Sequence, residues 1–408
     1  MRILLINDYA SLVGGAERGI LSLRDGLRSR GHDARLFASS ALRSPGAGFA
    51  DYECLGTTSM FRTLLQTANP FALLQLRRIL AEFQPDLVHV KIFLTQLSPL
   101  ILPPLRNIAS LFHVVWYRPI CPTGTKTLPN GSACRVNAGR ACYRNRCLAL
   151  HDWLPLMLQM KLWKQWRGAF DLVVANSEWI KQTLEANGFG SVEVVWNGVP
   201  VRAARPPLAF PPTAAFGGRL VREKGVDLLL HAFAKITDRV PQAKLIIAGD
   251  GPERATLQAL ARRLGLDSRV SWLGHLTQHE MEQRFSQAWV QVVPSLWAEP
   301  FGIVAAEAMM RGTAVIASNS GGLAEIVRDG ETGFLVPPGD IEALAGRLTQ
   351  ILQDRALTQR LGDAGRKTAL RDFNESRYVD NFLRLYERVL ASRGTSDRRK
   401  PESAHRVA

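Results

Sequence analysis

Short apolar runs alternate with amphipathic segments along the whole chain. The runs are rich in Val, Ile, Leu and Ala, as expected for strands that are buried on both faces of a parallel sheet. In the first half we predict strands at residues 1–6, 34–38, 87–90, 111–115, 172–175 and 193–195. In the second half we predict strands at residues 213–216, 243–248, 270–273, 290–293, 314–317 and 333–336. Strands that alternate with helices in this way predict an α/β protein with two doubly wound parallel sheets.

A proline-rich segment divides the two sets of strands. Residues 200–212 contain five prolines in thirteen positions and show no periodicity, which is typical of a linker. We therefore expect an N-terminal domain at residues 1–199 and a C-terminal domain at residues 213–373. Beyond them, residues 374–391 predict an amphipathic helix, and the polar and charged residues 392–408 are expected to be disordered.

Two carboxylates flank a Pro-Phe-Gly turn in the C-terminal half. Glu299 precedes the turn, and Glu307 falls in the second turn of the small-residue helix that the turn predicts. A helix start offers unpaired backbone amides and a positive dipole end, which together favour a bound phosphate. Here the amides belong to Phe301, Gly302 and Ile303. A phosphate held there would have a sugar near one carboxylate and a ribose near the other, so the pattern suits a nucleotide sugar.

A Gly-rich turn with two cations lies upstream, at residues 216–225. Gly218 is followed by Arg219 and Lys224, and an arginine fork with a lysine point charge suits a diphosphate. Gly249 ends another predicted strand and would let the backbone approach a ligand closely.

In this order and spacing the residues resemble the glycosyltransferases of family 4, which have the two-domain GT-B fold. The resemblance runs over residues 1–390, and its most specific parts are Gly218-Arg219-Leu220 with Lys224-Gly225, and the E-x7-E pair Glu299 and Glu307. It implies two Rossmann-like domains that face a central cleft, with the helix at residues 374–391 packed back on the first domain. It also implies that Arg219 and Lys224 neutralise the departing nucleotide diphosphate, that Glu299 holds the donor sugar and Glu307 the ribose. Gly14 and Gly15, within Val-Gly-Gly-Ala-Glu, would form the opposite lip.

The resemblance further implies a retaining transfer without a catalytic metal or other cofactor. The chain contains no Asp-x-Asp motif, so Arg219, Lys224 and the helix end would replace a cation at the diphosphate. The expected partners are a nucleotide sugar and a glycan or lipid-linked glycan, in polysaccharide or cell-envelope biosynthesis. Two other functions stay open: a GT-B sugar-nucleotide epimerase, and a non-catalytic, membrane-associated sugar-binding protein.

Many relatives carry a histidine on the acceptor side, at the end of the fourth or fifth N-domain strand. His113 is the nearest candidate in this chain, against the alternative of a satisfied histidine at a strand end. If the Cys-Pro after this strand fixes the register instead, the relatives' histidine falls on Val115.

The net charge of +15 is concentrated in one segment. Residues 118–167 hold nine Lys or Arg and one acid, Asp152, and residues 154–170 carry Leu, Trp and Phe at i, i+4 spacing beside Lys161, Lys164 and Arg167. This pattern fits an amphipathic helix at an anionic membrane surface, with Trp163 and Trp166 in the headgroup boundary, and equally a helix packed on its own sheet. No nucleic-acid-binding motif accompanies the charge.

Four of the five cysteines lie within residues 118–150, a basic insertion of the first domain. Cys121, Cys134, Cys142 and Cys147 could form a structural zinc or iron–sulfur site, disulfides, or free thiols. A similar cysteine-rich insertion occurs in some enzymes of the family. No Cys-x-x-Cys pair is present, which weakens the metal alternative.

The chain shows no apolar run of the ~18 residues needed to cross a bilayer. Its first apolar stretch is too short for a signal peptide and ends at Asn7-Asp8, so it predicts a strand. We therefore expect a cytoplasmic protein, peripheral on the inner face of the membrane if the basic helix binds lipid.

Overall fold

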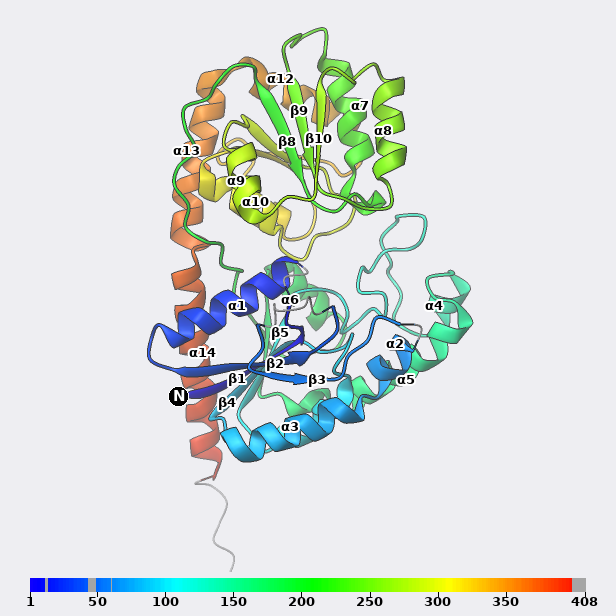
Figure 1. Ribbon diagram of the computed structural model, residues 1–408, viewed down its shortest axis with the longest axis vertical. Helices are drawn as coiled ribbons and strands as arrows, with labels where there is room; N and C mark the ends of the chain where they lie inside the picture. Colours follow the sequence, from blue (N-terminus) through cyan, green and yellow to red (C-terminus); the bar gives the residue numbers. More distant parts are fainter. Residues whose placement is uncertain (12–13, 43–48, 60, 398–408) are drawn as a thin grey trace, which may run out of the picture.

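The computed structural model describes residues 1–11, 14–42, 49–59 and 61–397 as two α/β domains stacked end to end (Figure 1). The N-domain holds a parallel sheet in the order β3-β2-β1-β4-β5-β6-β7, and the C-domain a parallel sheet in the order β10-β9-β8-β11-β12-β13. The first sheet consists of β1 (Arg2–Tyr9), β2 (Asp33–Ser39), β3 (Tyr52–Cys54), β4 (Leu87–Ile92), β5 (Ser110–Val114), β6 (Leu172–Ala175) and β7 (Val192–Val194). The second consists of β8 (Thr213–Gly217), β9 (Lys244–Ala248), β10 (Val270–Gly274), β11 (Val290–Val293), β12 (Ala314–Ser318) and β13 (Phe334–Val336).

The twelve predicted strands are confirmed, with ends that differ by a few residues. The sheets are doubly wound and parallel, as the apolar runs predicted. The strand that the pattern missed is β3, which is three residues long and lies at the edge of the first sheet.

Side chains of β1 alternate between two helical layers. Leu4 and Ile6 face the cluster that includes α3 (Pro70–Phe83), α5 (Leu150–Trp166) and α6 (Glu178–Glu185). Ile3 and Leu5 face the cluster formed with α1 (Gly15–Arg28) and α14 (Glu375–Asp397). The unbroken apolar run at residues 3–6 thus fills both layers at once.

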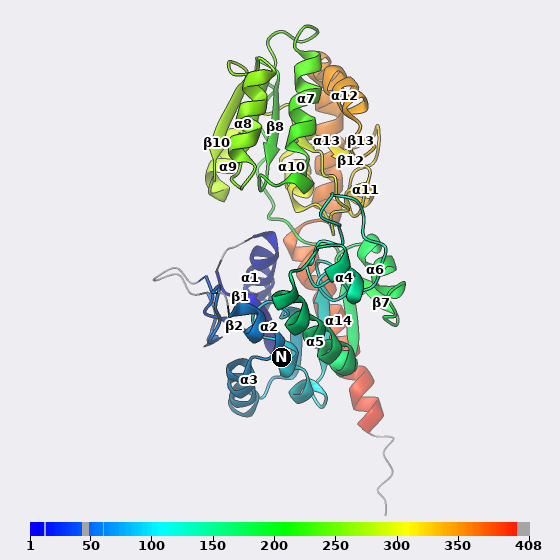
Figure 2. The same ribbon diagram turned by 90° about the vertical axis from the view of Figure 1, so that its right-hand side faces the viewer.

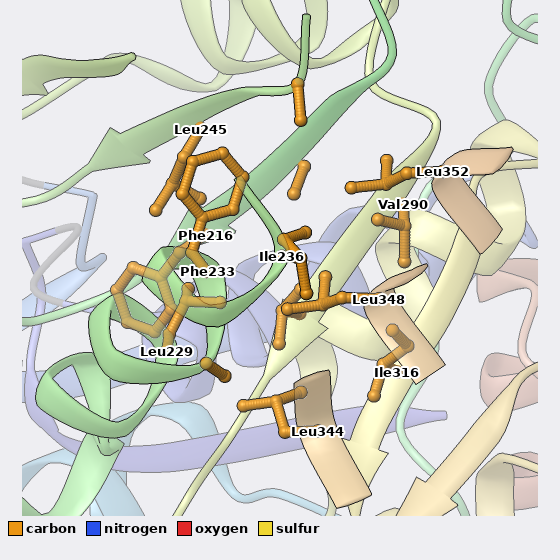
Figure 3. Packing of buried hydrophobic residues seen from close by; sticks show 14 of the residues in the cluster. Phe216, Leu229, Phe233, Ile236, Leu245, Val290, Ile316, Leu344, Leu348 and Leu352 are labelled. Carbon is orange, nitrogen blue, oxygen red and sulfur yellow. The ribbon is translucent and has the colours of Figure 1, made fainter. Parts of the chain in front are cut away.

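The C-domain core lies between its sheet and the helices α7 (Val226–Ile236) and α12 (Ile341–Gln353). Figure 3 shows Phe216, Leu245 and Val290 of the strands packed against Phe233 of α7 and Leu348 of α12. The remaining C-domain helices are α8 (Arg254–Arg263), α9 (Gln278–Phe285), α10 (Ile303–Arg311), α11 (Leu323–Ile326) and α13 (Arg355–Asp372). This packing fixes the carboxyl ends of β8 and β11, which lead into the Gly-rich turn and toward the E-x7-E segment.

The predicted C-terminal helix is confirmed and is longer than expected. α14 runs along the side of the N-domain in both ribbon views (Figures 1 and 2), and Tyr378, Phe382, Leu385 and Val389 are buried in the N-domain cluster. The expectation of disorder from residue 392 is corrected for residues 392–397, which continue the helix; residues 398–408 lie outside the described part of the chain.

Candidate active site

The start of α10 is built by a glycine that no other residue can replace without strain. Gly302 caps the helix with φ 104°, and a Cβ there would lie 2.4 Å from Cδ2 of Leu323. No side chain caps this helix start. The first amides of α10, after the buried side chain of Phe301, therefore remain available to an anionic ligand.

Glu299 is held next to this helix start by a lysine. Its side chain is buried, Lys224 Nζ donates to its Oε1 at 2.8 Å, and Ser295 donates to the same oxygen. Burial raises the pKa of Glu299, but Lys224 and Ser295 outweigh it and hold that pKa below its ordinary value. The carboxylate is thus ionised and can accept hydrogen bonds from sugar hydroxyls at neutral pH.

The Gly-rich turn brings a second cation to the same edge of the sheet. Gly249 has φ 135°, and a Cβ there would lie 1.8 Å from the carbonyl oxygen of Gly218, so the two turns touch backbone to backbone. Arg219 comes directly after Gly218 and is exposed. No hydrogen bond or ion pair joins its guanidinium to another residue in the described chain. Its charge remains available to a ligand.

Glu307 closes the other end of the site. It lies in the second turn of α10, where Arg18 Nη1 of α1 pairs with its Oε1 at 3.3 Å across the domains. Burial raises the pKa of Glu307, with Arg18 acting in the opposite direction. Gly15 faces Ile303 so closely that a Cβ on it would lie 3.0 Å from Ile303 Cδ1. The expected lip of Gly14 and Gly15 therefore stands opposite α10, with Gly14 at the start of α1.

An interdomain cavity of about 240 Å³ lies at the Glu307 end of the site. Gly15 and Arg18 line it from the N-domain, and Ile303 and Glu307 from the C-domain. Glu307 thus lies between the domains, whereas the Lys224–Glu299 pair belongs to the C-domain turns beside the start of α10 and does not line this cavity.

Comparison with known proteins agrees with this arrangement. The sequence model of Glycosyltransferase Family 4 matches residues 13–203, and that of Glycosyl transferases group 1 matches residues 202–368. The chain belongs to glycosyltransferase family 4. Its fold is GT-B: sucrose-phosphate synthase from Thermosynechococcus elongatus superposes with a TM-score of 0.73 at 24% identity, over 96% of this chain and 99% of that one.

Two further proteins are similar to this chain, one over nearly all of it and one over about half of it. Anabaena HepE in complex with UDP-glucose has a TM-score of 0.68 at 20% identity, over 96% of this chain and 100% of that one. A phosphatidyl-myo-inositol mannosyltransferase from Mycobacterium leprae is 35% identical over 216 residues, which are 51% of this chain and 56% of the relative. The chain spans about half the length, or less, of the curated relatives that it matches.

One residue expected in the family 4 site lies elsewhere. His113 is fully buried in β5, its ring 4.9 Å from that of Phe382 in α14, and neither ring nitrogen has a hydrogen-bond partner within the described chain. Burial lowers the pKa of His113 far below its ordinary value. The expectation of an acceptor-side histidine at this position is thus corrected, because α14 covers the side chain. Val115, on which the relatives' histidine falls in the alternative register, comes directly after β5 and is half-buried.

Aromatic residues that the sequence did not single out join the domains instead. The hydroxyl of Tyr117 donates to the carbonyl oxygen of Ala298 at 2.6 Å and accepts from Nε1 of Trp179 at 2.7 Å. Trp297 packs against Tyr117 with ring centroids 6.0 Å apart, and Lys224 Nζ lies 5.5 Å above the Trp297 ring. No local pattern marks these contacts, since they connect residues far apart in the sequence, and those of Tyr117 with Ala298 and Trp297 cross between the domains.

The predicted membrane helix is only partly exposed. Trp163 of α5 is buried in the N-domain core and donates to Pro119, so the expectation that it enters a headgroup boundary is corrected. Arg167 donates to the carbonyl of Gly188 and stacks on Phe189. Within the described residues, no helix combines the length and the hydropathy that a bilayer span requires.

The cysteine-rich insertion contains free thiols. Cys121 and Cys142 are buried, and Cys134 and Cys147 are half-buried. The described residues contain no group of three or more His, Cys, Asp or Glu side chains arranged to ligate a metal. Burial, reinforced by the neighbouring thiols, raises the pKa of Cys142 and of Cys147. The zinc or iron–sulfur site therefore stays a prediction from sequence, which elemental analysis of the purified protein would test.

Proposed function

We propose that the protein transfers a sugar from a nucleotide-diphosphate sugar to a glycan or lipid-linked glycan acceptor. The observation that carries this proposal is the Lys224–Glu299 pair beside the uncapped start of α10. Anabaena HepE, which shares the fold, has been crystallised with UDP-glucose, and this supports a nucleotide sugar as donor.

In the proposed site each group has a separate task. The donor's diphosphate would lie against the first amides of α10, with Arg219 and Lys224 neutralising it as the glycosidic bond breaks. Glu299 would accept hydrogen bonds from the sugar and Glu307 from the ribose. Stabilisation of the leaving group by fixed charges is commonly the largest catalytic contribution, at about 3 to 4 kcal/mol for one well-placed donor.

The transfer is proposed to retain the anomeric configuration and to need no catalytic metal. Arg219, Lys224 and the dipole of α10 would supply the positive charge at the proposed diphosphate position in place of a bound cation. Product NMR would give the anomeric configuration, and activity should survive EDTA. An absolute requirement for added magnesium would contradict the metal-free mechanism.

The decisive experiment measures nucleotide release with and without a lipid-linked glycan. A thermal-shift panel of UDP, GDP, ADP and their sugars first identifies the donor, because a ligand at ~100 times its dissociation constant adds about 2.7 kcal/mol. Acceptor-dependent release supports transfer. Conversion of the donor sugar without release would indicate an epimerase, and binding without turnover a sugar-binding protein.

We further propose that the enzyme works at an anionic membrane surface in polysaccharide or cell-envelope biosynthesis. Leu154 and Leu158 of α5 are 59% and 51% exposed, and Phe61 and Leu64 of the neighbouring region at α2 (Arg62–Thr67) are 61% and 60% exposed. The two helices pack together in the N-domain (Figure 2), joined by the hydroxyl of Thr67, which donates to α5. Exposed apolar side chains beside cations are typical of an interfacial surface.

A further inference from the structure

A second cavity lies within the N-domain, beside the exposed helices α2 and α5. Its volume is about 330 Å³, and Trp116, Gln96 and Thr95 line it together with the charged residues Arg62, Arg118 and Asp152. It opens where β4 and β5 end, the edge of the sheet that faces the C-domain. Trp116 directly precedes Tyr117, whose hydroxyl bonds the carbonyl oxygen of Ala298 next to Glu299. The cavity is therefore connected to the donor site by adjacent residues.

Arg118 is a buried cation that forms no direct ion pair within the described chain. Only 6% of the residue is exposed, and no carboxylate of the described chain forms an ion pair with it. Its Nη2 donates to the amide oxygens of Gln66 and Gln159 and to the carbonyl of Leu94, while its Nε has no partner among the described residues. Burial lowers the pKa of Arg118 to about 10, so the guanidinium remains charged at neutral pH.

The buried carboxylate of Asp8 favours the charged form of Arg118 from a distance, but no hydrogen bond or ion pair joins the two side chains within the described chain. Both oxygens of Asp8 already accept hydrogen bonds: Oδ1 from the amides of Gln96 and Leu97 at 2.8 and 2.9 Å, and Oδ2 from the amide and hydroxyl of Thr95 at 2.7 and 2.6 Å. Burial raises the pKa of Asp8. A buried guanidinium that donates only to neutral oxygens, and whose Nε has no partner in the described chain, is suited to recognise an anion.

The rim of the cavity carries a second cation. Arg62 at the start of α2 is exposed, and no ion pair or hydrogen bond holds its guanidinium to a described residue. Asp152 is the one acidic residue among the described residues that line this cavity. Its side chain is 29% exposed, and its Oδ2 lies 3.5 Å from Nε2 of His151. Trp116 offers a flat face whose position is fixed by Gly124, because the backbone there runs so close that a Cβ on Gly124 would lie 2.9 Å from the Trp116 ring.

We propose that this cavity is an acceptor subsite for a phosphate group, with Arg118 at its base, Arg62 at its rim and Trp116 against an attached sugar. The inference rests on the proposed function and names the acceptor class: a phosphorylated sugar. The phosphate could belong to a soluble sugar phosphate or to a polyprenyl phosphate that enters from the membrane beside α2 and α5.

The test must separate this subsite from the donor's diphosphate site. We therefore use the Arg219→Ala/Lys224→Ala double variant and measure binding of glucose 1-phosphate by ³¹P NMR line broadening at low salt. Binding should persist in this background. Adding Arg62→Ala should weaken it about tenfold, as expected for the loss of a charge-assisted hydrogen bond. Adding Arg77→Ala, an exposed arginine of α3 outside the cavity, should change nothing.

Arg118 is tested by a pair of variants, because its burial makes substitution risky. Arg118→Gln should abolish phosphate binding and Arg118→Lys should restore part of it, with thermal unfolding measured for both. Methyl glucoside, the neutral analogue, should bind far more weakly than glucose 1-phosphate. A second arm replaces the soluble probe with phosphatidylcholine vesicles that contain polyprenyl phosphate.

Phosphate-dependent binding in either arm that Arg62→Ala weakens supports the subsite and identifies the source of the phosphate. The inference is overturned if neither probe binds, or if Arg62→Ala binds as well as the Arg77→Ala control. The proposed function is judged separately, by nucleotide release from the wild-type protein. If the cavity binds phosphate but the wild type consumes no donor, the cavity is an anion-binding site, and its assignment as an acceptor subsite is wrong.

Discussion

Lys224 and Glu299 form the most heavily constrained charge pair of the proposed donor site. The lysine side chain is 22% exposed and the glutamate 8%, so removal of either charge leaves the other poorly solvated. Arg219 is different, because it is exposed and without a partner in the described chain. The two cations therefore allow the leaving-group role to be separated from the structural one.

We predict that Arg219→Ala and Lys224→Ala each lower turnover by about two orders of magnitude or more. Arg219→Ala should do so with an unchanged melting temperature, whereas Lys224→Ala should also reduce stability. Arg222→Ala, in the same turn, is the matched control. Steady-state kinetics and thermal unfolding provide the readouts, and near-normal turnover in both alanine variants would contradict the assignment.

A second prediction concerns Lys91, which is 1% exposed in β4. Burial lowers its pKa from 10.5 to about 8, with Glu17 acting in the opposite direction. Between these two values the folded state binds fewer protons than the unfolded state, so this group makes the free energy of unfolding rise with pH. The wild type should therefore gain stability relative to Lys91→Met between pH 8 and pH 10.

Denaturant unfolding across this pH range measures the effect. Lys235→Met is the control, since Lys235 is half exposed and paired with Glu342. A difference between wild type and Lys91→Met that stays constant with pH would contradict the depressed pKa.

At the residue scale the sequence predicted positions that local turn chemistry sets, while the roles of these residues stay predictions. Glu299, Gly302 and Glu307 occupy the expected places because a Pro-Phe-Gly turn specifies its own geometry. His113 failed because α14, more than 250 positions later, covers it. Arg118 and Tyr117 were missed for the same reason: their partners come from distant segments.

At the scale of elements, α5 presents one buried and one exposed face. Leu156, Met160 and Trp163 pack inward, while Leu154 and Leu158 face outward. An i, i+4 row of leucines is compatible with either face, and only the tertiary packing decides which row is covered. The edge strand β3 was missed because three residues are too few to give a period.

We predict that Leu154→Ser/Leu158→Ser reduces flotation with anionic vesicles, because these side chains supply apolar area at the proposed surface. Lys161→Glu/Lys164→Glu should abolish flotation at low salt, since each cation near an anionic surface is worth about 1 kcal/mol. Transfer to a soluble acceptor analogue should survive in both double variants.

Leu370→Ser is the matched control for the leucine variant, because Leu370 is an exposed leucine of α13 in the C-domain. If the wild type never floats, α5 is a packed element and membrane proximity must come from another surface.

At the scale of the whole molecule, a carboxylate of one domain caps a helix of the other. Glu325 in α11 accepts from the backbone amides of Glu178 and Trp179 at the start of α6. Arg18 and Glu307 form a second interdomain pair, which a donor ribose at Glu307 would have to displace. Opening and closing of the two domains therefore involves breaking identifiable contacts.

We predict that donor binding makes the molecule more compact and that Glu325→Ala makes it more open. Small-angle scattering would report the radius of gyration with and without donor. Glu331→Ala, whose carboxylate is 70% exposed and 3.9 Å from Arg328, should scatter like the wild type. A profile that neither donor nor Glu325→Ala alters would count against domain closure.

The two-domain division and the parallel sheets could be predicted from the alternation of apolar runs and from the proline-rich segment. The relation between the domains could not, because it depends on single contacts such as Tyr117 with Ala298. Residues 392–397 were also misjudged: their polarity suits a solvated helix end as well as a disordered tail.

The path of α14 has a consequence for how the chain matures. Phe382 and Tyr386 fill the same cluster as Ile3 and Leu5, although the ribosome makes these residues at opposite ends of synthesis. The part of this cluster that α14 fills, beside α1, therefore stays open until α14 has emerged. The N-domain is translated first but can complete its packing only after α14 has been made. A chain truncated before residue 375 would expose apolar side chains of this cluster, which chaperones could bind.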